Sequence, residues 1–293
     1  MAVIEIDTIE KLVAFSGGEY GRGTSSEYLD VVLTADLDFN DLKEYDNPYN
    51  WAGCTGTWYI NFDGQGHKID NIYYMGAAAW GFFNTLYGSV KNLKLTNMYV
   101  TSVTAYCCGL MCFLYGTAEN CQISGYIAAL NNADSTPACG ICFRRGGGSV
   151  IRACSVSGTI KGTASALGIC QNSDSTSYTF NCLVRADIEG GTANTLPLTS
   201  ERAICNNCIF IGTVKAGSNS HVGGYNAIFT NCLFVYKAGS STNFRTVSVY
   251  FYNCYYDDTV AQAAGFSLAS WLNAATTEEI QNGQWLHDHG FAR

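Results

Sequence analysis

The chain has 293 residues, of which 47% are hydrophobic and only 14% are charged. So few charges exclude a coiled coil, and the hydrophobic content with only 3 prolines excludes a disordered chain. The net charge is −8 and the 16 basic residues form no cluster, so no nucleic-acid partner is expected. No apolar run of about 18 residues occurs, so no membrane insertion is predicted.

Residues 1–60 are predicted to form an N-terminal cap and the first strands. A short helix is expected to begin at Asp7–Glu10, which resembles a capping box, and to end at Gly17–Gly18. One face of this helix carries its apolar residues, Leu12, Val13 and Phe15. Acidic residues interrupt the first apolar stretch, so we expect no export signal and synthesis in the cytoplasm.

Residues 61–258 contain a repeated motif in which a turn-forming residue, mostly Asn, precedes a cysteine and a short β-rich stretch. The repeated positions are Ile69, Leu93, Cys121, Cys154, Cys182, Cys208, Cys232 and Cys254. They are separated by 24, 28, 33, 28, 26, 24 and 22 residues. Intervals of this length that hold several short strands predict one coil of a parallel β-helix each. Glycine and β-branched residues inside each unit argue against helices.

A second motif, a small residue followed by apolar residues, accompanies the first. It begins at Gly81, Gly109, Gly140, Gly168, Ala203 and Ala227. It precedes the repeated cysteine by 12 to 14 residues in the middle units and by 5 in the last two. We therefore expect a shortened loop in the last two coils, because solenoids accept length changes in loops between fixed strands.

The 14 cysteines allow either seven disulfides or free thiols. Parallel stacking places equivalent Cβ atoms about 4.8 Å apart, whereas a disulfide needs about 3.8 Å. We therefore expect mostly free thiols in an interior column. The preceding asparagines are expected at turns, because their side chains bond to nearby backbone.

Residues 259–293 are predicted to form a C-terminal helical cap or tail. Three apolar residues have helical spacing there: Leu268, Trp271 and Leu272. Thr276 and Glu279 match a second capping box, and Ile280 and Trp285 are expected to pack onto the end of the coil. The expected fold is therefore an all-β, single-stranded parallel β-helix (a solenoid) with short helical caps at both ends.

Four segments resemble pectin-lyase-like parallel β-helices with GLUG-type repeats: Ile9–Leu12, Leu33–Phe39, Phe62–Ile69 and Gly88–Leu95. The resemblance covers about residues 5–256. It implies a right-handed β-helix of the kind found in phage particles and bacterial surface proteins, and by analogy a homo-oligomer, for a spike a trimer. Cysteine at core positions and the missing export signal depart from the surface versions of that group.

An aromatic strand followed by two acids is the predicted contact for a glycan, because aromatic faces beside acids can hold sugar rings. Its residues are Tyr250, Tyr252, Tyr255, Tyr256, Asp257 and Asp258. Two other carboxylate groups are candidates for glycan cleavage. The pair Asp36 and Asp38 is interpreted as structural, and the group Asp41, Glu44 and Asp46 as a solvated loop.

Other reactive patterns are interpreted as structural. They are Asp63 with His67, His287 with His289, Cys139 with Cys142, Cys205 with Cys208, and Arg144-Arg145 in a loop with Gly146–Gly148. The solenoid register already explains the cysteine pairs, with Cys142 and Cys205 in one column and Cys208 in another. The Arg144–Gly148 segment is expected to be an exposed mobile loop. No metal, cofactor or catalytic residue is predicted.

The favoured function is a non-enzymatic structural or attachment protein of a phage virion, as a tail fibre, spike or head-surface component. Its expected partners are other virion proteins and a host-surface glycan, and its expected location is the virion. One alternative is a bacterial adhesin that is secreted or held at the cell surface. The other is a polysaccharide lyase or hydrolase.

Overall fold

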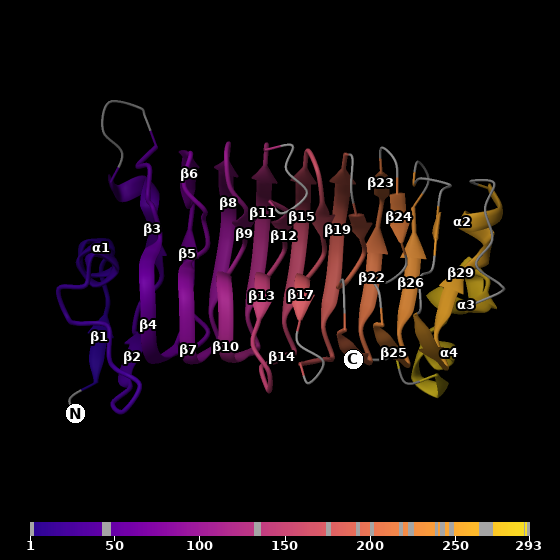
Figure 1. The fold of residues 1–293 in the computed structure, drawn as a ribbon. Coiled ribbons are helices and arrows are strands. Elements are labelled where there is room, and N and C mark those ends of the chain that lie inside the picture. The colour runs from indigo at the N-terminus through magenta and orange to yellow at the C-terminus, as the bar shows by residue number, and fades with distance from the viewer. Residues whose placement is uncertain are drawn as a thin grey trace.

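In a computed structural model, the chain winds into an elongated parallel β-solenoid, consistent with a right-handed parallel β-helix (Figure 1). Its strands stack coil upon coil into three sheets, within which neighbouring strands run parallel. This confirms the expected fold class. The structure describes residues 3–42, 48–131, 136–173, 177–191, 194–199, 202–216, 219–221, 226–237, 240, 244–245, 249–263, 272–289 and 291.

The first sheet runs the length of the molecule. Its strands in stacking order are β1 (Ile4–Ile6), β2 (Leu29–Leu33), β4 (Cys54–Asp63), β7 (Phe83–Lys91), β10 (Met111–Glu119), β14 (Val150–Arg152), β18 (Tyr178–Phe180), β21 (Ile204–Asn206), β25 (Ile228–Thr230) and β28 (Tyr250–Tyr252). Two further strands branch from it: β13 (Cys142–Arg145) pairs with β10, and β17 (Cys170–Ser173) pairs with β13.

The second sheet also runs from end to end. Its strands are β3 (Leu37–Asp38), β5 (Lys68–Asp70), β8 (Lys94–Ser102), β11 (Gln122–Ala129), β15 (Ser155–Gly162), β19 (Leu183–Gly190), β22 (Ile209–Gly212), β26 (Leu233–Tyr236), β29 (Tyr255–Asp257) and β30 (Asn273–Ala275), with β6 (Tyr73–Gly76) and β23 (Val214–Ala216) at its side. The third sheet consists of β9 (Cys107–Cys108), β12 (Ala138–Cys139), β16 (Ala166–Leu167), β20 (Asn194–Leu196), β24 (Asn219–His221) and β27 (Phe244–Arg245).

The corner between the first and second sheets is a repeated left-handed residue. Asparagine occupies it in most coils, as at Asn120 (φ 51°) and Asn181 (φ 52°), and Ala153 occupies it once (φ 51°). Asparagine adopts this conformation more readily than other residues with a side chain. The predicted turn role of these asparagines is therefore confirmed.

The cysteine that follows each corner points into the core. All 14 cysteines are buried and free, which confirms the expected interior thiols. In each repeat the thiol donates to the carbonyl two residues earlier, as from Cys121 to Glu119 at 3.3 Å and from Cys254 to Tyr252 at 3.5 Å. The earliest repeat was misaligned, because Ile69 pairs with Leu95 and not with Leu93.

The expected shortened loop is wrong. Cys142 pairs with Cys170, which bridges to Thr199, whereas Cys205 pairs with Thr179 and Phe229. Cys142 and Cys205 therefore belong to different columns. In the middle coils two successive strands line the same core, as β13 and β14 do beside β10. Both strands follow a small residue and contain apolar residues. The sequence motif does not distinguish these two strands.

The N-terminal helix α1 (Ile9–Gly17) forms as predicted, with Thr8 as its N-cap and Gly18 (φ 88°) ending it. Its apolar face enters the core, where the ring of Phe15 lies 4.7 Å from that of Trp58. The capping box is incomplete, because Lys11 and not Glu10 occupies the third helical position. A short 3-10 helix, η1 (Phe39–Leu42), follows β3.

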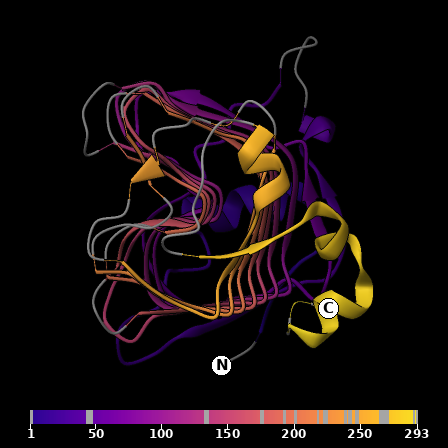
Figure 2. The ribbon, with the colours of Figure 1, turned by 90° about the vertical axis from the view of Figure 1, so that its right-hand side faces the viewer.

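The C-terminal helices differ from expectation. Helix α2 (Asp258–Ala263) lies at the last coil, whereas α3 (Thr277–Gln281) and α4 (Gly283–Asp288) pack against the outside of the second sheet (Figure 2). The capping box of Thr276 and Glu279 is confirmed. None of the helices described is long and apolar enough to cross a membrane.

The expected packing of Ile280 and Trp285 onto the end of the coil is therefore wrong. Leu183 at the start of β19 and the outward residues of β22 and β26 are apolar, and α3 and α4 cover them. The cluster contains Leu183, Ile209, Leu233, Ile280, Trp285, Leu286 and Phe291. Leu272 directly precedes strand β30, so no helix continues through it, and Leu268 and Trp271 lie outside the described residues.

Candidate functional site

The structure separates the six residues of the predicted glycan contact. Tyr250 and Tyr252 point outward from β28, with 54% and 56% of each residue exposed. Tyr255 is half-buried under α4, with its ring 5.4 Å from that of Trp285. A left-handed corner at Asn253 (φ 51°) turns the chain from the first sheet to the second between these two groups.

Tyr256 and Asp257 are wrong as glycan contacts, because they are 0% and 1% exposed. Alternation along β29 turns Tyr256 into the core, where its hydroxyl donates to Asp258 at 2.5 Å. Asp257 accepts a hydrogen bond of 2.9 Å from the Thr277 hydroxyl, and so ties β29 to α3. Tyr250 and Tyr252 remain as the surface part of the prediction.

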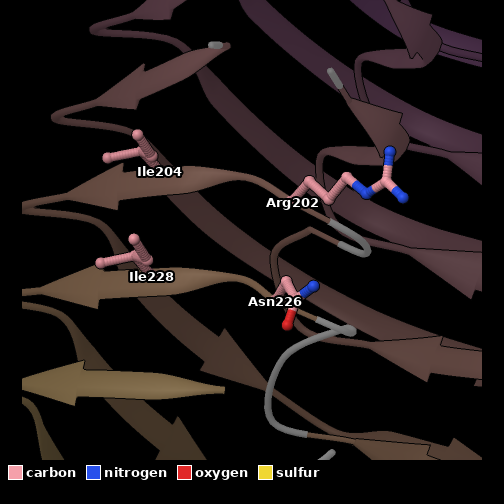
Figure 3. A pocket seen from close by; sticks show the side chains of 4 residues that line it. All are labelled: Arg202, Ile204, Asn226 and Ile228. Atoms are coloured by element: carbon pink, nitrogen blue, oxygen red, sulfur yellow. The ribbon is translucent and has the colours of Figure 1, made fainter. Parts of the chain in front are cut away.

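Tyr250 belongs to an apolar column on the outer face of the first sheet. The column passes through Tyr178, Ile204, Ile228 and Tyr250, which lie in register on β18, β21, β25 and β28. Beside it is a pocket of about 390 Å³ lined by Arg202, Ile204, Asn226 and Ile228 (Figure 3). We call these six residues the outer-face site: Tyr178, Arg202, Ile204, Asn226, Ile228 and Tyr250.

Arg202 and Asn226 occupy equivalent positions in consecutive coils, because each lies two residues before one of the isoleucines that line the pocket, Ile204 and Ile228. Both are left-handed, with φ of 58° and 57°. That conformation is ordinary for asparagine, but for arginine it costs roughly 1–2 kcal/mol. Figure 3 shows the Arg202 side chain beside that of Asn226, on the same side of the two strands. The fold thus places a cation and an amide beside the apolar surface formed by Ile204 and Ile228, which we call the isoleucine floor.

The tyrosines of this region differ from those nearer the N-terminus. Tyr59, Tyr87 and Tyr115 form a stack with ring centroids 4.7 and 4.6 Å apart, so their neighbours cover the ring faces. In the described part of the first sheet, β28 is the last strand of its path. No stacked ring from a following strand of that path therefore covers Tyr250 or Tyr252.

The other carboxylates considered for catalysis have structural partners. Asp36 accepts from the Lys68 backbone N–H at 3.0 Å and contacts the His67 ring at 3.1 Å, and these interactions lower the pKa of Asp36. Asp38 accepts from the Asn71 amide at 2.8 Å. Asp63 likewise accepts from its neighbours in the corner stack and does not contact His67 in any described hydrogen bond. Glu44 and Asp46 lie outside the described residues.

The potential metal ligands do not converge. His289 stacks on Trp285 at 4.1 Å, whereas His287 lies exposed beside Asp288. Cys139 lies in a second small core with Cys108, whereas Cys142 faces the main core. Within the described ranges, no group of three or more His, Cys, Asp or Glu residues could hold a metal ion.

The Arg144–Gly148 segment is only partly an exposed loop. Arg144 is exposed over the ring of Phe143, but Arg145 is 3% exposed and points into the core. Strand β13 explains this, because Arg145 pairs with the inward residue Leu114 of the previous coil. The expectation of a mobile loop is therefore wrong for Arg145. The sequence also gave no signal for Arg202 and Asn226 beyond their shared spacing to Ile204 and Ile228.

No protein-family model and no curated protein matches the sequence. Among solved structures, the chain is similar to a putative immunoglobulin A1 protease from Bacteroides ovatus, determined at 1.30 Å resolution. The TM-score is 0.62 at 17% sequence identity, over 97% of this chain and 86% of that one. At this identity the similarity shows the fold alone, and that fold is a parallel β-helix.

Proposed function

We propose that the protein is a non-enzymatic attachment protein of a phage virion that binds an acidic host-surface glycan at the outer-face site. The observation that carries the proposal is the position of Arg202 and Asn226 at the edge of a floor of Ile204 and Ile228, next to the exposed ring of Tyr250. Pockets for ligands commonly combine an apolar lining with a few polar groups that fix orientation.

The residue types favour a sugar that carries a carboxylate. A guanidinium binds a carboxylate through two parallel hydrogen bonds, and an amide can both donate to and accept from hydroxyls. The isoleucine floor and the Tyr250 ring offer apolar surface for the C–H face of a sugar ring. The protein as a whole is acidic, with a net charge of −8, so the local cation at Arg202 would supply the specific attraction.

A binding role is favoured over cleavage by the composition of the pocket. Most glycoside hydrolases use two carboxyl groups, about 5–10 Å apart, on either side of the bond that is cleaved. The described residues that line the pocket are an arginine, an asparagine and two isoleucines. These residues can hold a glycan but offer no general acid.

The virion assignment depends on the fold and on the thiols. The sequence resembles β-helices with GLUG-type repeats, and such a fold suits the surface of a particle. By analogy with such spikes, we expect a trimer. Fourteen buried free thiols fit assembly in a reducing cytoplasm better than secretion. Thiol titration of the denatured, unreduced protein should therefore find about 14 groups. Pairwise loss of thiols would favour the adhesin.

The binding test uses a panel of bacterial capsular polysaccharides with and without uronic acids. We expect the wild type to bind a subset of the acidic ones, and Arg202→Ala and Tyr250→Ala each to weaken that binding at least tenfold. Tyr115→Ala is the matched control, because Tyr115 is also exposed but lies in the upstream stack. New reducing ends or unsaturated uronates would contradict a non-enzymatic role.

The particle test is independent of the glycan. Mass spectrometry of purified phage particles should detect this chain in several copies per particle. Its absence from the particles, with the gene far from virion genes, would contradict the virion assignment while leaving glycan binding open to the first test.

A further inference from the structure

A second pocket lies on the outer face of the second sheet, where the C-terminal helices α3 and α4 pack (Figure 2). It has a volume of about 420 Å³ and is bounded by β19, β22 and β26 on one side and by the two helices and Phe291 on the other. Small-molecule sites have volumes of about 300–1,000 Å³, so this space is large enough for a ligand. We call it the cap pocket. It is separate from the outer-face site, which lies on the first sheet.

The strand side of the cap pocket consists of two columns of outward side chains. One column is Leu183, Ile209 and Leu233, and the other is Arg185, Ile211 and Val235, each in register on the three strands. In the coil before β19, the equivalent positions are Ser155 and Ser157. The aliphatic surface therefore begins at β19, and Arg185 lies at its border with the polar part of the sheet.

The helical side of the cap pocket is anchored near the last coil. The Trp285 ring lies 5.4 Å from that of Tyr255 on β29, and His289 stacks on Trp285 at 4.1 Å. The residues that line the pocket come from the preceding strands β19, β22 and β26 and from the roof above them. Ile211 and Leu286 stay half-exposed although they belong to the covered cluster. The helices thus leave part of this aliphatic surface accessible.

Arg185 is exposed and is the one charged side chain among the described residues that line the cap pocket. No ion pair between described residues includes it. Asp187, the next outward residue of β19, accepts instead from the N–H and the hydroxyl of Thr213, at 3.2 and 2.6 Å. A guanidinium at the border of an aliphatic pocket is complementary to a ligand with an anionic head and an aliphatic chain.

We infer that the cap pocket binds a free aliphatic carboxylate, such as a medium-chain fatty acid. The Arg185 guanidinium donates to the carboxylate, and the chain lies over Ile211 and Val235, where it removes apolar surface from water. A sugar is disfavoured, because the other side chains that line the pocket are aliphatic or aromatic and offer no hydrogen-bonding group. This inference does not rest on the proposed glycan binding.

The first test uses the wild-type protein and isothermal titration calorimetry at neutral pH. Octanoate, decanoate and the neutral analogue decanol are compared below the concentrations at which they form micelles. Affinity should rise about fourfold for each added methylene, because the burial of one methylene is worth about 0.8 kcal/mol. Decanoate should bind about fivefold more tightly than decanol. No binding of decanoate, or an affinity that does not change with chain length, would overturn the inference.

The second test separates the head of the ligand from its chain. Arg185→Gln should weaken decanoate binding about fivefold and leave decanol binding unchanged, whereas Ile211→Thr should weaken both. Both side chains lie at the surface, and Arg152→Gln is the matched control, because Arg152 is an exposed arginine on β14 of the first sheet. Wild-type affinity for decanoate in Arg185→Gln, or an equal loss in Arg152→Gln, would contradict the assigned role of Arg185.

Two further comparisons identify the source of the ligand and the site that binds it. Vesicles of phosphatidylglycerol carry both acyl chains and anionic heads, and we expect no binding to them when free acid is absent. Binding to these vesicles but not to free decanoate would overturn the inference in favour of a membrane contact. Arg202→Ala, which alters the outer-face site, should bind decanoate as the wild type does. A failure of glycan binding can therefore be distinguished from a failure at the cap pocket.

Discussion

The side-chain amide of Asn120 donates a hydrogen bond of 2.8 Å to the side-chain oxygen of Asn92, one coil earlier. The same contact recurs between Asn207 and Asn181 at 3.2 Å and between Asn253 and Asn231 at 2.8 Å. The corner of the solenoid is thus fixed twice, by a left-handed backbone and by a side-chain stack. Ala153 stands at the same corner without a side-chain amide.

Ala153→Asn should stabilise the protein. Asparagine tolerates the left-handed conformation at φ 51° better than alanine, and its amide can reach the stack of the neighbouring coils. We expect a gain of about 1 kcal/mol in the free energy of unfolding, measured by chemical denaturation. Asn120→Ala is the reciprocal control and should lose a similar amount. A destabilised Ala153→Asn would mean that the corner has no room for the amide.

Cys154→Ser should destabilise the protein by about 1–3 kcal/mol, because a more polar hydroxyl replaces a buried thiol. The Cys154 thiol donates to the Arg152 carbonyl at 3.3 Å, and the shorter serine side chain fills the column less well. A melting curve measures the effect. An unchanged melting temperature would place this side chain outside the packed column.

Gly140→Ala should cost about 1–3 kcal/mol or more, because the new methyl group would overlap the carbonyl oxygen of Gly168 in the next coil. Gly17→Ala is the matched control. No atom lies within 4 Å of a methyl group built at Gly17, at the end of α1. If denaturation curves showed equal effects at the two glycines, the close approach of successive coils would be incorrect.

The protein should lose stability in acid through Asp70. Burial alone raises the pKa of this carboxyl, but Lys68, Thr96 and Asn97 donate to it and hold its pKa below 3.8 in the folded state. A carboxyl with a lowered folded pKa stabilises the fold above its unfolded pKa, and this contribution disappears as the pH falls through the folded value. Asp70→Asn should be less stable at pH 7 and less sensitive below pH 3.8. An identical acid response in both proteins would contradict this assignment.

The fold was predictable because its main signal is local. A turn-forming residue, mostly asparagine, followed by a cysteine recurs at intervals of 22 to 33 residues, and left-handed geometry and inward packing follow from those residue types. Alignment of the coils was less predictable, as Cys205 shows. The segment Ala203-Ile204-Cys205 resembles Gly168-Ile169-Cys170, but Cys205 and Cys170 lie on different strands of the coil. Only the hydrogen-bonded register of the strands distinguishes these two positions.

The candidate site was harder to predict because it depends on contacts between coils. Tyr250 was recognisable as an aromatic residue on an exposed strand. Arg202 and Asn226 are 24 residues apart, and only stacking brings them to one pocket. Arg145 was placed in a loop because a charged residue rarely faces a core, and only its pairing with Leu114 turns it inward.

The most direct test of the proposed attachment function compares one glycan in two forms. An acidic capsular polysaccharide that binds in the panel is converted to its carboxyl-reduced, neutral counterpart, and the affinity of the protein for both is measured by calorimetry. The wild type should bind the acidic form at least tenfold more tightly, and Arg202→Ala should lose that difference. Equal affinity of the wild type for both forms, or an undiminished difference in Arg202→Ala, would contradict recognition at the outer-face site.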